Sequence, residues 1–281
     1  MSEWFQNGQR VNSVPAGDRG MQYGDGLFET VAIRGSHPRL WSLHVERMRA
    51  SAERLGLPVP SEARLESALS SALAATTLDP NALTAKLLLT AGLGLRGYRR
   101  HEPAKTALYV SLHLPRQLDR EAYATGVATR VCATRLAIQP ALAGIKSLNR
   151  LEQVLASQEL AANECFEGLM LDTEDNLICG TMSNVFVVRD NQYVTPRLDG
   201  AGVAGVMRRH IIGLLETDRS RWEETRLSLK DIESAEEVFL SNSQFGVVPV
   251  ARIDERDLEP GTATRRVQAL LASNGVPECE P

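Results

Sequence analysis

Ala143-Gly-Ile-Lys-Ser-Leu-Asn-Arg-Leu-Glu-Gln-Val-Leu-Ala156 is the segment of this chain that carries the most information. At its centre lies a lysine, Lys146, which follows a glycine-containing turn. The chain has only four lysines, and they are Lys86, Lys105, Lys146 and Lys230. The apolar residues after the turn recur with the 3.6-residue period of a helix, and they are Leu148, Leu151, Val154 and Leu155. The segment therefore predicts a lysine just ahead of a helix.

A lysine in this position has two interpretations. Most lysines are solvated surface residues, and Lys146 can simply mark the start of the helix. A lysine that points into a cleft can instead lose its charge by desolvation and become a nucleophile that forms a Schiff base. Because spacing alone is compatible with both, the residues around Lys146 leave the choice open.

Length and composition restrict the class of protein. With 281 residues the chain is long enough for two modest domains or one large domain. A hydrophobic content of 43% and a charged content of 23% are typical of a globular protein. A net charge of −4 gives no electrostatic basis for binding nucleic acid or an anionic membrane. No apolar run is long enough to span a bilayer, and the first ten residues lack the regions of a signal peptide.

The cysteines and histidines predict neither disulfides nor a metal site. The four cysteines, Cys132, Cys165, Cys179 and Cys279, form no Cys-x-x-Cys pair and are too few for a disulfide framework. They are typical of reduced thiols in a cytoplasmic protein. The five histidines are scattered without metal-ligand spacing, so we expect no structural or catalytic metal.

The pattern of apolar residues predicts an α/β chain in two halves. Expected strands cover residues 27–33, 82–90, 106–112, 126–132, 166–172, 176–178 and 237–240, and a hairpin covers 4–11 with Asn-Gly at its turn. Expected helices cover residues 42–55, 61–75 and 263–272, another follows Lys146 and runs to about Asn163, and the segment 200–210 opens a helix that runs to about Glu216. A short segment interrupted by Pro115 is the best candidate for a linker. We therefore divide the chain into an N-terminal domain (1–113), a linker (114–120) and a C-terminal domain (121–281) that carries the lysine.

The lysine segment resembles that of the fold-type IV pyridoxal-phosphate (PLP) enzymes. This family includes the D-amino-acid and branched-chain aminotransferases and the 4-amino-4-deoxychorismate lyases, and Asn149-Arg-Leu-Glu-Gln153 is similar to the lyase branch. The resemblance implies a two-domain α/β fold with mixed sheets, like that of D-amino-acid aminotransferase. It also implies PLP at the domain junction, Lys146 as its Schiff-base partner, and a homodimer in which the partner chain completes the site.

Three motifs of the first half extend the resemblance. Asp18-Arg-Gly-Met-Gln-Tyr23-Gly-Asp-Gly is similar to the family segment that lines the mouth of the active site, which makes Tyr23 a candidate for substrate binding. His44-Val-Glu-Arg47-Met resembles the segment whose arginine binds the PLP phosphate, a role that suits a planar guanidinium. The glycine-rich loop ends on Arg96-Gly-Tyr, as in the lyases, so Arg96 is a candidate for a substrate carboxylate.

Two motifs of the second half concern the phosphate. The glycines and small residues around Gly205 precede a helix, and the segment 196–208 is similar to the lyases at many positions. The resemblance assigns phosphate contacts to the backbone of Val206 and Met207, where the helix dipole would assist. Asn242 and Ser243 match the family's small polar loop and are expected to complete the phosphate site.

One position departs from the family. Asn184 and Phe186 match the motif Glu-x-x-x-x-Asn-x-Phe, but Cys179 stands where the glutamate is expected. In the family that glutamate keeps the pyridine nitrogen protonated, so that the ring withdraws electrons from a carbanion. A thiol is mainly neutral at pH 7 and is a weak hydrogen-bonding group. Cys179 is therefore either a cofactor contact of a different kind or a small packing residue.

The resemblance implies a lyase that converts 4-amino-4-deoxychorismate into p-aminobenzoate and pyruvate for folate synthesis. Lys146 would serve as Schiff-base partner, general base and proton donor. Because the reaction creates an aromatic ring, a lyase can tolerate a less electron-withdrawing cofactor than a transaminase, which would account for Cys179. Two alternatives stay open: an aminotransferase of the D-amino-acid or branched-chain type, and a PLP-binding protein without turnover.

Overall fold

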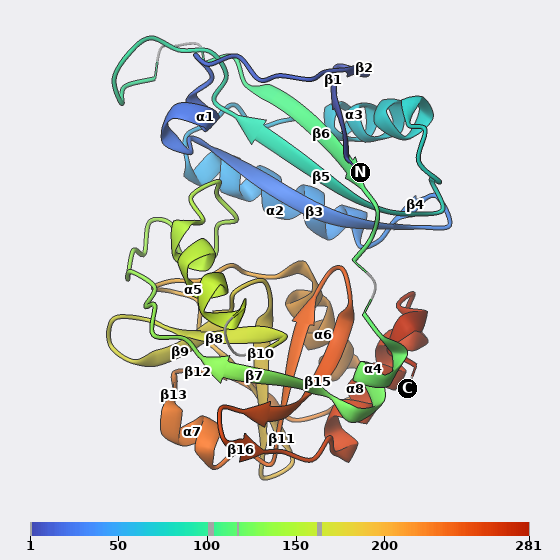
Figure 1. Ribbon diagram of the computed structural model, residues 1–281, viewed down its shortest axis with the longest axis vertical. Coiled ribbons are helices and arrows are strands. Elements are labelled where there is room, and N and C mark those ends of the chain that lie inside the picture. The colour runs from blue at the N-terminus through green and yellow to red at the C-terminus, as the bar shows by residue number, and fades with distance from the viewer. Residues whose placement is uncertain (1, 101–103, 117, 162–164, 281) are drawn as a thin grey trace. The chain divides into compact units, whose positions relative to one another are not determined.

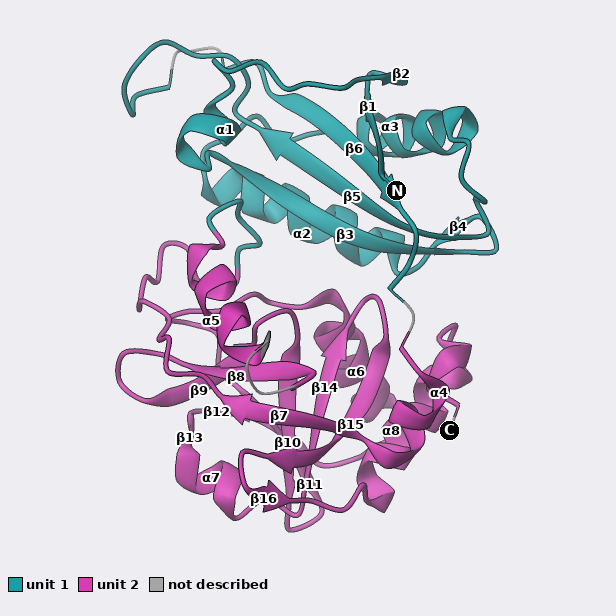
Figure 2. Cartoon of the chain, viewed as in Figure 1, with its two compact units in different colours: residues 1–116, 145–149 teal, residues 117–144, 150–281 magenta. Residues whose placement is uncertain are grey.

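The computed structural model describes residues 2–100, 104–116, 118–161 and 165–280 (Figure 1). The chain forms two compact units, which Figure 2 colours separately. Unit 1 comprises residues 1–116 and 145–149, and unit 2 comprises residues 117–144 and 150–281. The division after residue 116 falls inside the expected linker, of which residue 117 lies outside the described residues. The short segment with Lys146 belongs to unit 1, whereas we had expected it in the C-terminal domain.

Unit 1 is built on a six-stranded antiparallel sheet with the strand order β2-β1-β6-β5-β3-β4. Its strands are β1 (Ser2–Gln6), β2 (Gln9–Arg10), β3 (Gly26–Arg34), β4 (His37–Pro38), β5 (Ala82–Thr90) and β6 (Ala107–His113). The turn between β1 and β2 has positive φ at Asn7 (51°) and Gly8 (76°), as the expected Asn-Gly hairpin requires. A short helix, α1 (Arg19–Tyr23), occupies part of what we expected to be a loop.

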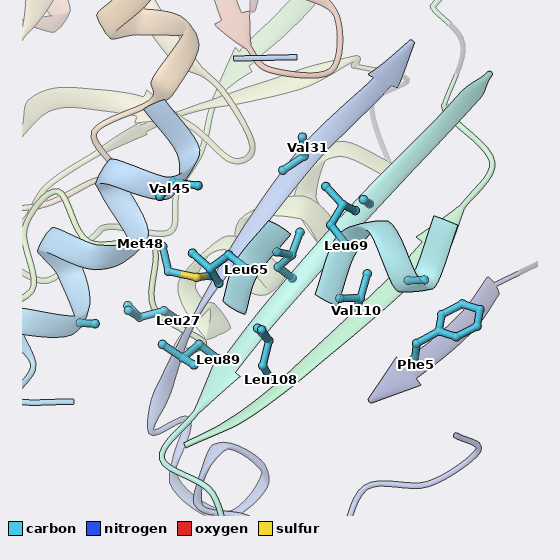
Figure 3. Close-up of a cluster of buried hydrophobic side chains, with 14 of the residues drawn as sticks. Phe5, Leu27, Val31, Val45, Met48, Leu65, Leu69, Leu89, Leu108 and Val110 are labelled. Carbon is cyan, nitrogen blue, oxygen red and sulfur yellow. The ribbon is translucent and has the colours of Figure 1, made fainter. Parts of the chain in front are cut away.

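Two helices, α2 (Trp41–Arg54) and α3 (Glu62–Ala75), supply the apolar core on one face of this sheet (Figure 3). Alternation along β3 explains the arrangement, because successive side chains of a strand point to opposite faces. Leu27 and Val31 are buried in the core with Met48 of α2 and Leu65 of α3. Phe28 and its neighbours two residues away therefore lie on the opposite face of the sheet.

Unit 2 contains a ten-stranded mixed sheet with the order β12-β11-β10-β14-β15-β7-β8-β9-β13, and β16 pairs with β15. The strands are β7 (Val127–Val131), β8 (Glu167–Leu171), β9 (Asn176–Gly180), β10 (Asn184–Arg189), β11 (Gln192–Pro196), β12 (Trp222–Thr225), β13 (Leu227–Ser228), β14 (Glu237–Asn242), β15 (Gly246–Ile253) and β16 (Arg256–Asp257). Parallel pairs join β7 to β8 and β15 and join β11 to β12, while the other pairs are antiparallel. The expected class, α/β with mixed sheets, is confirmed.

The helices of unit 2 include the one that follows the lysine segment. They are α4 (Arg120–Thr125), α5 (Leu151–Ala161), α6 (Val206–Thr217), α7 (Leu229–Glu233) and α8 (Thr262–Ala272), and a 3₁₀ turn covers Pro277–Cys279. The expected end of α5 near Asn163 lies outside the described residues. The apolar face of this helix is exposed: Leu151 keeps 77% of its surface, Val154 50% and Leu155 59%. None of the helices in the described part of the chain has the length and hydropathy needed to cross a bilayer.

Candidate active site

Lys146 lies on an extended segment that adds to the edge of β3. The backbone N–H of Phe28 donates to the carbonyl of Lys146 (3.0 Å), and the N–H of Leu148 donates to the carbonyl of Gly26 (3.0 Å). Leu27 and Ser147 form an antiparallel bridge between them. These bonds attach residues 145–149 to unit 1, whereas the division made from sequence grouped Lys146 with the C-terminal half. The helix starts only at Leu151, so the lysine is held by a strand and not by a helix N-terminus.

The side chain of Lys146 packs on an aromatic ring. Its Nζ lies 4.2 Å from the centroid of the Phe28 ring, a distance at which a cation is attracted to the ring face. Phe28 is itself fixed by the pairing of β3 with β5. The amine therefore has a defined position on a rigid part of unit 1, as a nucleophile needs.

A buried carboxylate stands beside this segment. Glu29 accepts two hydrogen bonds from the guanidinium of Arg47, one from Nε at 2.8 Å and a shorter one from Nη2. It also lies 2.6 Å from Nδ1 of His44. Burial alone would raise the pKa of Glu29, but Arg47 and His44 outweigh it and lower the pKa to about 2. The arginine expected to bind phosphate is thus held by an ionised glutamate that our sequence analysis did not assign.

His44 completes this network as a neutral imidazole. Burial lowers its pKa, so at neutral pH it carries one ring proton. Since the ionised Glu29 can only accept, that proton belongs on Nδ1. The buried Nε2 of His44 has no hydrogen-bond partner among the residues that the structure describes. Lys146 is close enough to contribute to the lowered pKa of His44, which places the lysine and the arginine's network in one region of unit 1.

The glycine-rich loop is tied to unit 1 by a second carboxylate. Asp25 accepts hydrogen bonds from Nε of Arg19 (2.8 Å) and Nε of Arg100 (2.9 Å). Burial opposes ionisation of Asp25, yet the two arginines lower its pKa. Arg19 also donates to the carbonyls of Gly97 and Tyr98, both at 2.8 Å. Arg19, Asp25 and Arg100 lie in or near the motifs quoted from the sequence. Only the structure shows that they form one ion-pair cluster that supports the loop.

The two candidates for substrate binding lie in this part of unit 1. The hydroxyl of Tyr23 accepts a hydrogen bond from the N–H of Gly97 (3.1 Å), so the tyrosine supports the loop. Arg96 is exposed on the same loop and makes no ion pair with any residue in the described ranges. Their contacts with substrate stay predictions.

Cys179 lies in β9, in an apolar part of unit 2. It is 6% exposed and belongs to a cluster with Cys132, Met170 and Ile178. Burial, reinforced by the charge of Glu167, raises the pKa of its thiol to about 12. The thiol is therefore neutral at physiological pH and does not act as an anion. Arg150 is near enough to interact electrostatically with Cys179, and burial lowers the pKa of this arginine.

The loop after Cys179 is fixed by a buried carboxylate that our motif analysis missed. Glu167, fully buried in β8, accepts hydrogen bonds from the N–H of Thr181 (3.0 Å), the N–H of Met182 (3.2 Å) and the hydroxyl of Ser183 (2.8 Å). It therefore holds residues 180–183 in one conformation. No spacing rule pointed to this residue, because its partners lie in the loop that follows β9.

Asn184 and the start of α6 form a close-packed pair in unit 2. The side chain of Asn184 donates to the carbonyl of Val203 (2.9 Å). A Cβ added to Gly205 would lie 1.9 Å from Oδ1 of Asn184, so only glycine fits there. The helix has no side-chain cap, which leaves the first N–H groups, those of Val206 and Met207, available for an anion. The phosphate contacts expected of Val206 and Met207 stay predictions.

The loop after β14 is closed by its own side chains. Oδ1 of Asn242 accepts from the N–H groups of Gln244 (2.9 Å) and Phe245 (3.0 Å), the pattern of an Asx turn. Nδ2 of Asn242 lies 3.4 Å from the carbonyl of Met182, which connects this loop to the one that Glu167 holds. The phosphate contacts expected of Asn242 and Ser243 stay predictions.

The sequence of the chain matches a known family over most of its length. The model of amino-transferase class IV matches residues 26–253. The chain belongs to this family. Its fold is that of the fold-type IV enzymes, with an antiparallel sheet in unit 1 and a mixed sheet in unit 2.

Curated relatives within the class IV aminotransferases include a lyase and aminotransferases. The chain is 37% identical to the aminodeoxychorismate lyase of Vibrio harveyi over 277 residues, which cover 95% of this chain and 99% of that protein. It is 28% identical to the D-alanine aminotransferase of Bacillus licheniformis over 93% of this chain and 92% of that protein. The similarity to the lyase is thus higher and extends over both units.

Among solved structures, a lyase is again more similar to this chain than an aminotransferase, in both sequence identity and TM-score. The 4-amino-4-deoxychorismate lyase of Pseudomonas aeruginosa superposes with a TM-score of 0.91 and is 37% identical, covering 97% of this chain and 99% of that one. The branched-chain amino acid aminotransferase of Escherichia coli has a TM-score of 0.86 at 23% identity, covering 98% and 95%. The second likeness shows the shared fold alone.

Proposed function

We propose that the chain is a PLP-dependent aminodeoxychorismate lyase, which converts 4-amino-4-deoxychorismate to p-aminobenzoate and pyruvate. The observation that carries the proposal is Lys146, a lysine fixed by backbone pairing to β3 and by its contact with Phe28, within a chain similar to the lyases over nearly its whole length. The 37% identity to lyases against 28% to a D-alanine aminotransferase favours the lyase over the aminotransferase.

The residues of the chain suit a phosphorylated pyridine cofactor. The uncapped N-terminus of α6, with Gly205 packed against Asn184, offers N–H donors to an anion. Arg47 offers a guanidinium held by Glu29. PLP, when bound, supplies an aldehyde that condenses with amines and a ring that accepts electrons from a carbanion. Val206, Met207, Asn242 and Ser243 are the further residues that we propose as phosphate contacts.

Lys146 has the main chemical role in this proposal. The amine of Lys146 would hold PLP covalently when the cofactor is bound, and the same amine would take the proton from the substrate ring carbon that bears the nitrogen. We assign the same amine as the proton donor for the departing enol. The Lys146 side chain would thus hold the cofactor, take a proton from the substrate and give a proton to the enol.

The assay that tests the proposal is direct. PLP-loaded protein should form p-aminobenzoate from enzymatically generated 4-amino-4-deoxychorismate. Absence of product in a fully loaded sample would exclude the lyase. Conversion of the bound cofactor to its pyridoxamine form by D-alanine would then indicate the aminotransferase, and the absence of both reactions would indicate a binding protein without turnover.

The side chain at position 179 should have little effect on p-aminobenzoate turnover. We propose that a neutral, buried thiol near the ring suffices because the lyase reaction gains driving force from the aromatic product. Replacing a neutral weak hydrogen-bonding group should cost about 0.5–1.5 kcal/mol, so Cys179→Ala should keep p-aminobenzoate turnover within about tenfold of wild type. An increase of several orders of magnitude in Cys179→Glu would contradict the idea.

We also propose that the protein is a homodimer, and the exposed face of α5 supports this. Leu151, Val154 and Leu155 are exposed on one helix, although their apolar side chains favour burial. A charge at Leu155 should disrupt an interface there. Light scattering after size exclusion should show a dimer for wild type and for Leu93→Glu, a matched exposed leucine in unit 1, and a monomer for Leu155→Glu. A dimer of unchanged stability in Leu155→Glu would place the interface elsewhere.

A further inference from the structure

The hairpin turn 242–246, which joins β14 to β15, carries two of the proposed phosphate contacts, Asn242 and Ser243. The carboxamide of Asn242 accepts the N–H groups of Gln244 and Phe245 and so closes the turn from its own side. The groups that hold the rest of the turn come from distant parts of unit 2.

The first of these groups is the thiol of Cys279, in the 3₁₀ turn Pro277–Cys279. The N–H of Val247 donates to its sulfur (3.3 Å), and the same sulfur lies 3.6 Å from the carbonyl oxygen of Phe245, within reach of an S–H donor. Cys279 is fully buried. Its side chain therefore contacts the backbone immediately before and after Gly246.

Gly246 permits this close approach. Its φ is 73°, and a Cβ added there would lie 2.3 Å from Sγ of Cys279 and 2.8 Å from Cγ1 of Val276. Val276 is fully buried, and its N–H donates to the carbonyl of Leu271 in α8 (3.0 Å). The 3₁₀ turn is thus anchored to α8 and packs directly on the backbone of the hairpin turn.

A second group, from α4, supports the same carbonyl oxygen. The hydroxyl of Tyr123 donates to the carbonyl of Phe245 (3.0 Å). Tyr123 is in turn held by α8, because Nε2 of Gln268 donates to its carbonyl (2.9 Å), and both residues are buried. Two elements that lie beside α8, namely α4 and the 3₁₀ turn, therefore converge on one peptide group of the hairpin turn (Figure 1).

We propose that Cys279 is a positioning residue for the cofactor phosphate, which acts through the hairpin turn 242–246. The inference rests on the proposed function, since the turn contacts a phosphate only if PLP binds as proposed. Cys279 itself does not touch the phosphate. It holds the peptide groups of Phe245 and Val247, so that Asn242 and Ser243 are ordered before the cofactor arrives. A turn that is ordered in advance loses less conformational freedom on binding.

The test compares two probes that differ only in the phosphate. Calorimetry on the full chain, freed of bound cofactor, measures the affinity for pyridoxamine 5′-phosphate and for pyridoxamine. Cys279→Ala removes the sulfur, and Cys279→Ser keeps a hydrogen-bonding group at this position. Ile232→Val is the matched control, because it also removes one buried heavy atom, in this case from α7.

Cys279→Ala should bind pyridoxamine 5′-phosphate about three- to tenfold more weakly than wild type, the factor expected when side chains must become ordered on binding. Its affinity for pyridoxamine should stay unchanged, Cys279→Ser should lie between Cys279→Ala and wild type, and Ile232→Val should match wild type with both probes. Unchanged affinity for the phosphorylated probe would overturn the proposal. An equal loss for both probes would also overturn it, because that result indicates a general effect on structure. If Cys279→Ala does not fold, the two probes decide in the same way with Cys279→Ser.

A variant of the turn itself tests the route of the effect. Ser243→Ala should weaken binding of pyridoxamine 5′-phosphate, and adding Cys279→Ala to it should cause a smaller further loss than in wild type, since residues that act through one another are not additive. Full additivity would contradict action through the turn. Failure of the wild type to bind pyridoxamine 5′-phosphate would overturn the inference, whereas binding without p-aminobenzoate formation would count against the lyase function alone.

Discussion

Lys146→Ala should abolish p-aminobenzoate formation, with a loss of roughly 10⁴-fold or more relative to wild type. The reason is that one amine would provide the covalent attachment, the base and the proton donor. Product would be measured by its fluorescence after chromatography. The variant should also lose the visible absorbance of lysine-bound PLP, which reports on attachment separately from turnover.

Lys230→Ala is the matched control, because Lys230 is an exposed lysine at a distance along the chain. It should retain full activity and absorbance. If Lys146→Ala kept both properties, the attachment would involve another amine, and Lys86 would be the first to examine because it contacts the same phenyl ring. Thermal unfolding of both variants shows whether a loss of activity is a loss of structure.

Glu29→Gln should destabilise the protein by roughly 3–5 kcal/mol, the cost of breaking a buried ion pair by removing one partner. The substitution leaves Arg47 without its counter-charge and gives His44 a neutral neighbour. The free energy of unfolding in urea would measure the loss. Binding of PLP should weaken as well, because the guanidinium would no longer be held in one orientation.

The pH dependence gives this prediction a definite sign. The pKa of Glu29 is about 2 in the folded protein against an ordinary value of 4.5, so its ionisation stabilises the folded state above pH 4.5. That contribution, roughly 3 kcal/mol, is lost as the pH falls from 4.5 toward 2. Glu29→Gln should lack this acid-dependent loss, whereas Glu66→Gln, an exposed glutamate on α3, should retain it. A wild-type protein whose stability is constant over this range would contradict the assignment.

Much of the fold was predictable because local patterns decided it. Strand β5 has the expected bounds, and α2, α3 and α8 differ from prediction by a residue or so at their ends, where assignments are least certain. Apolar periodicity and helix caps are local signals, and they were enough to locate these helices and this strand. The short helix α1 escaped prediction because its start depends on Asp18, whose side chain accepts the N–H of Gly20 (2.7 Å) and the hydroxyl of Thr90 (2.8 Å), a residue far along the chain.

The candidate site was predictable only in part. Motif resemblance pointed to Lys146, Arg47 and the start of α6, and the structure places each on a fixed element. It gave no role to Glu29, which ends the quoted Tyr-Gly-Asp-Gly-Leu-Phe-Glu signature, or to Glu167, because their roles depend on several hydrogen bonds that converge on a buried carboxylate. Nor did it indicate the pairing of residues 145–149 with β3, since strand addition at the edge of a sheet is a tertiary event without a local sequence signal.

Residues 145–149 belong to unit 1 although they follow the first part of unit 2 in the sequence, which affects folding during synthesis. A ribosome releases residues 1–116 first, but β3 then still lacks the segment that pairs with its starting residues. Unit 1 can complete its native contacts only after the first stretch of unit 2, residues 117–144, has been synthesised. The nascent chain must keep an exposed strand edge until residue 149 emerges. A gene divided after codon 116 would therefore encode two fragments, and the first would lack residues 145–149, which carry Lys146 and pair with β3.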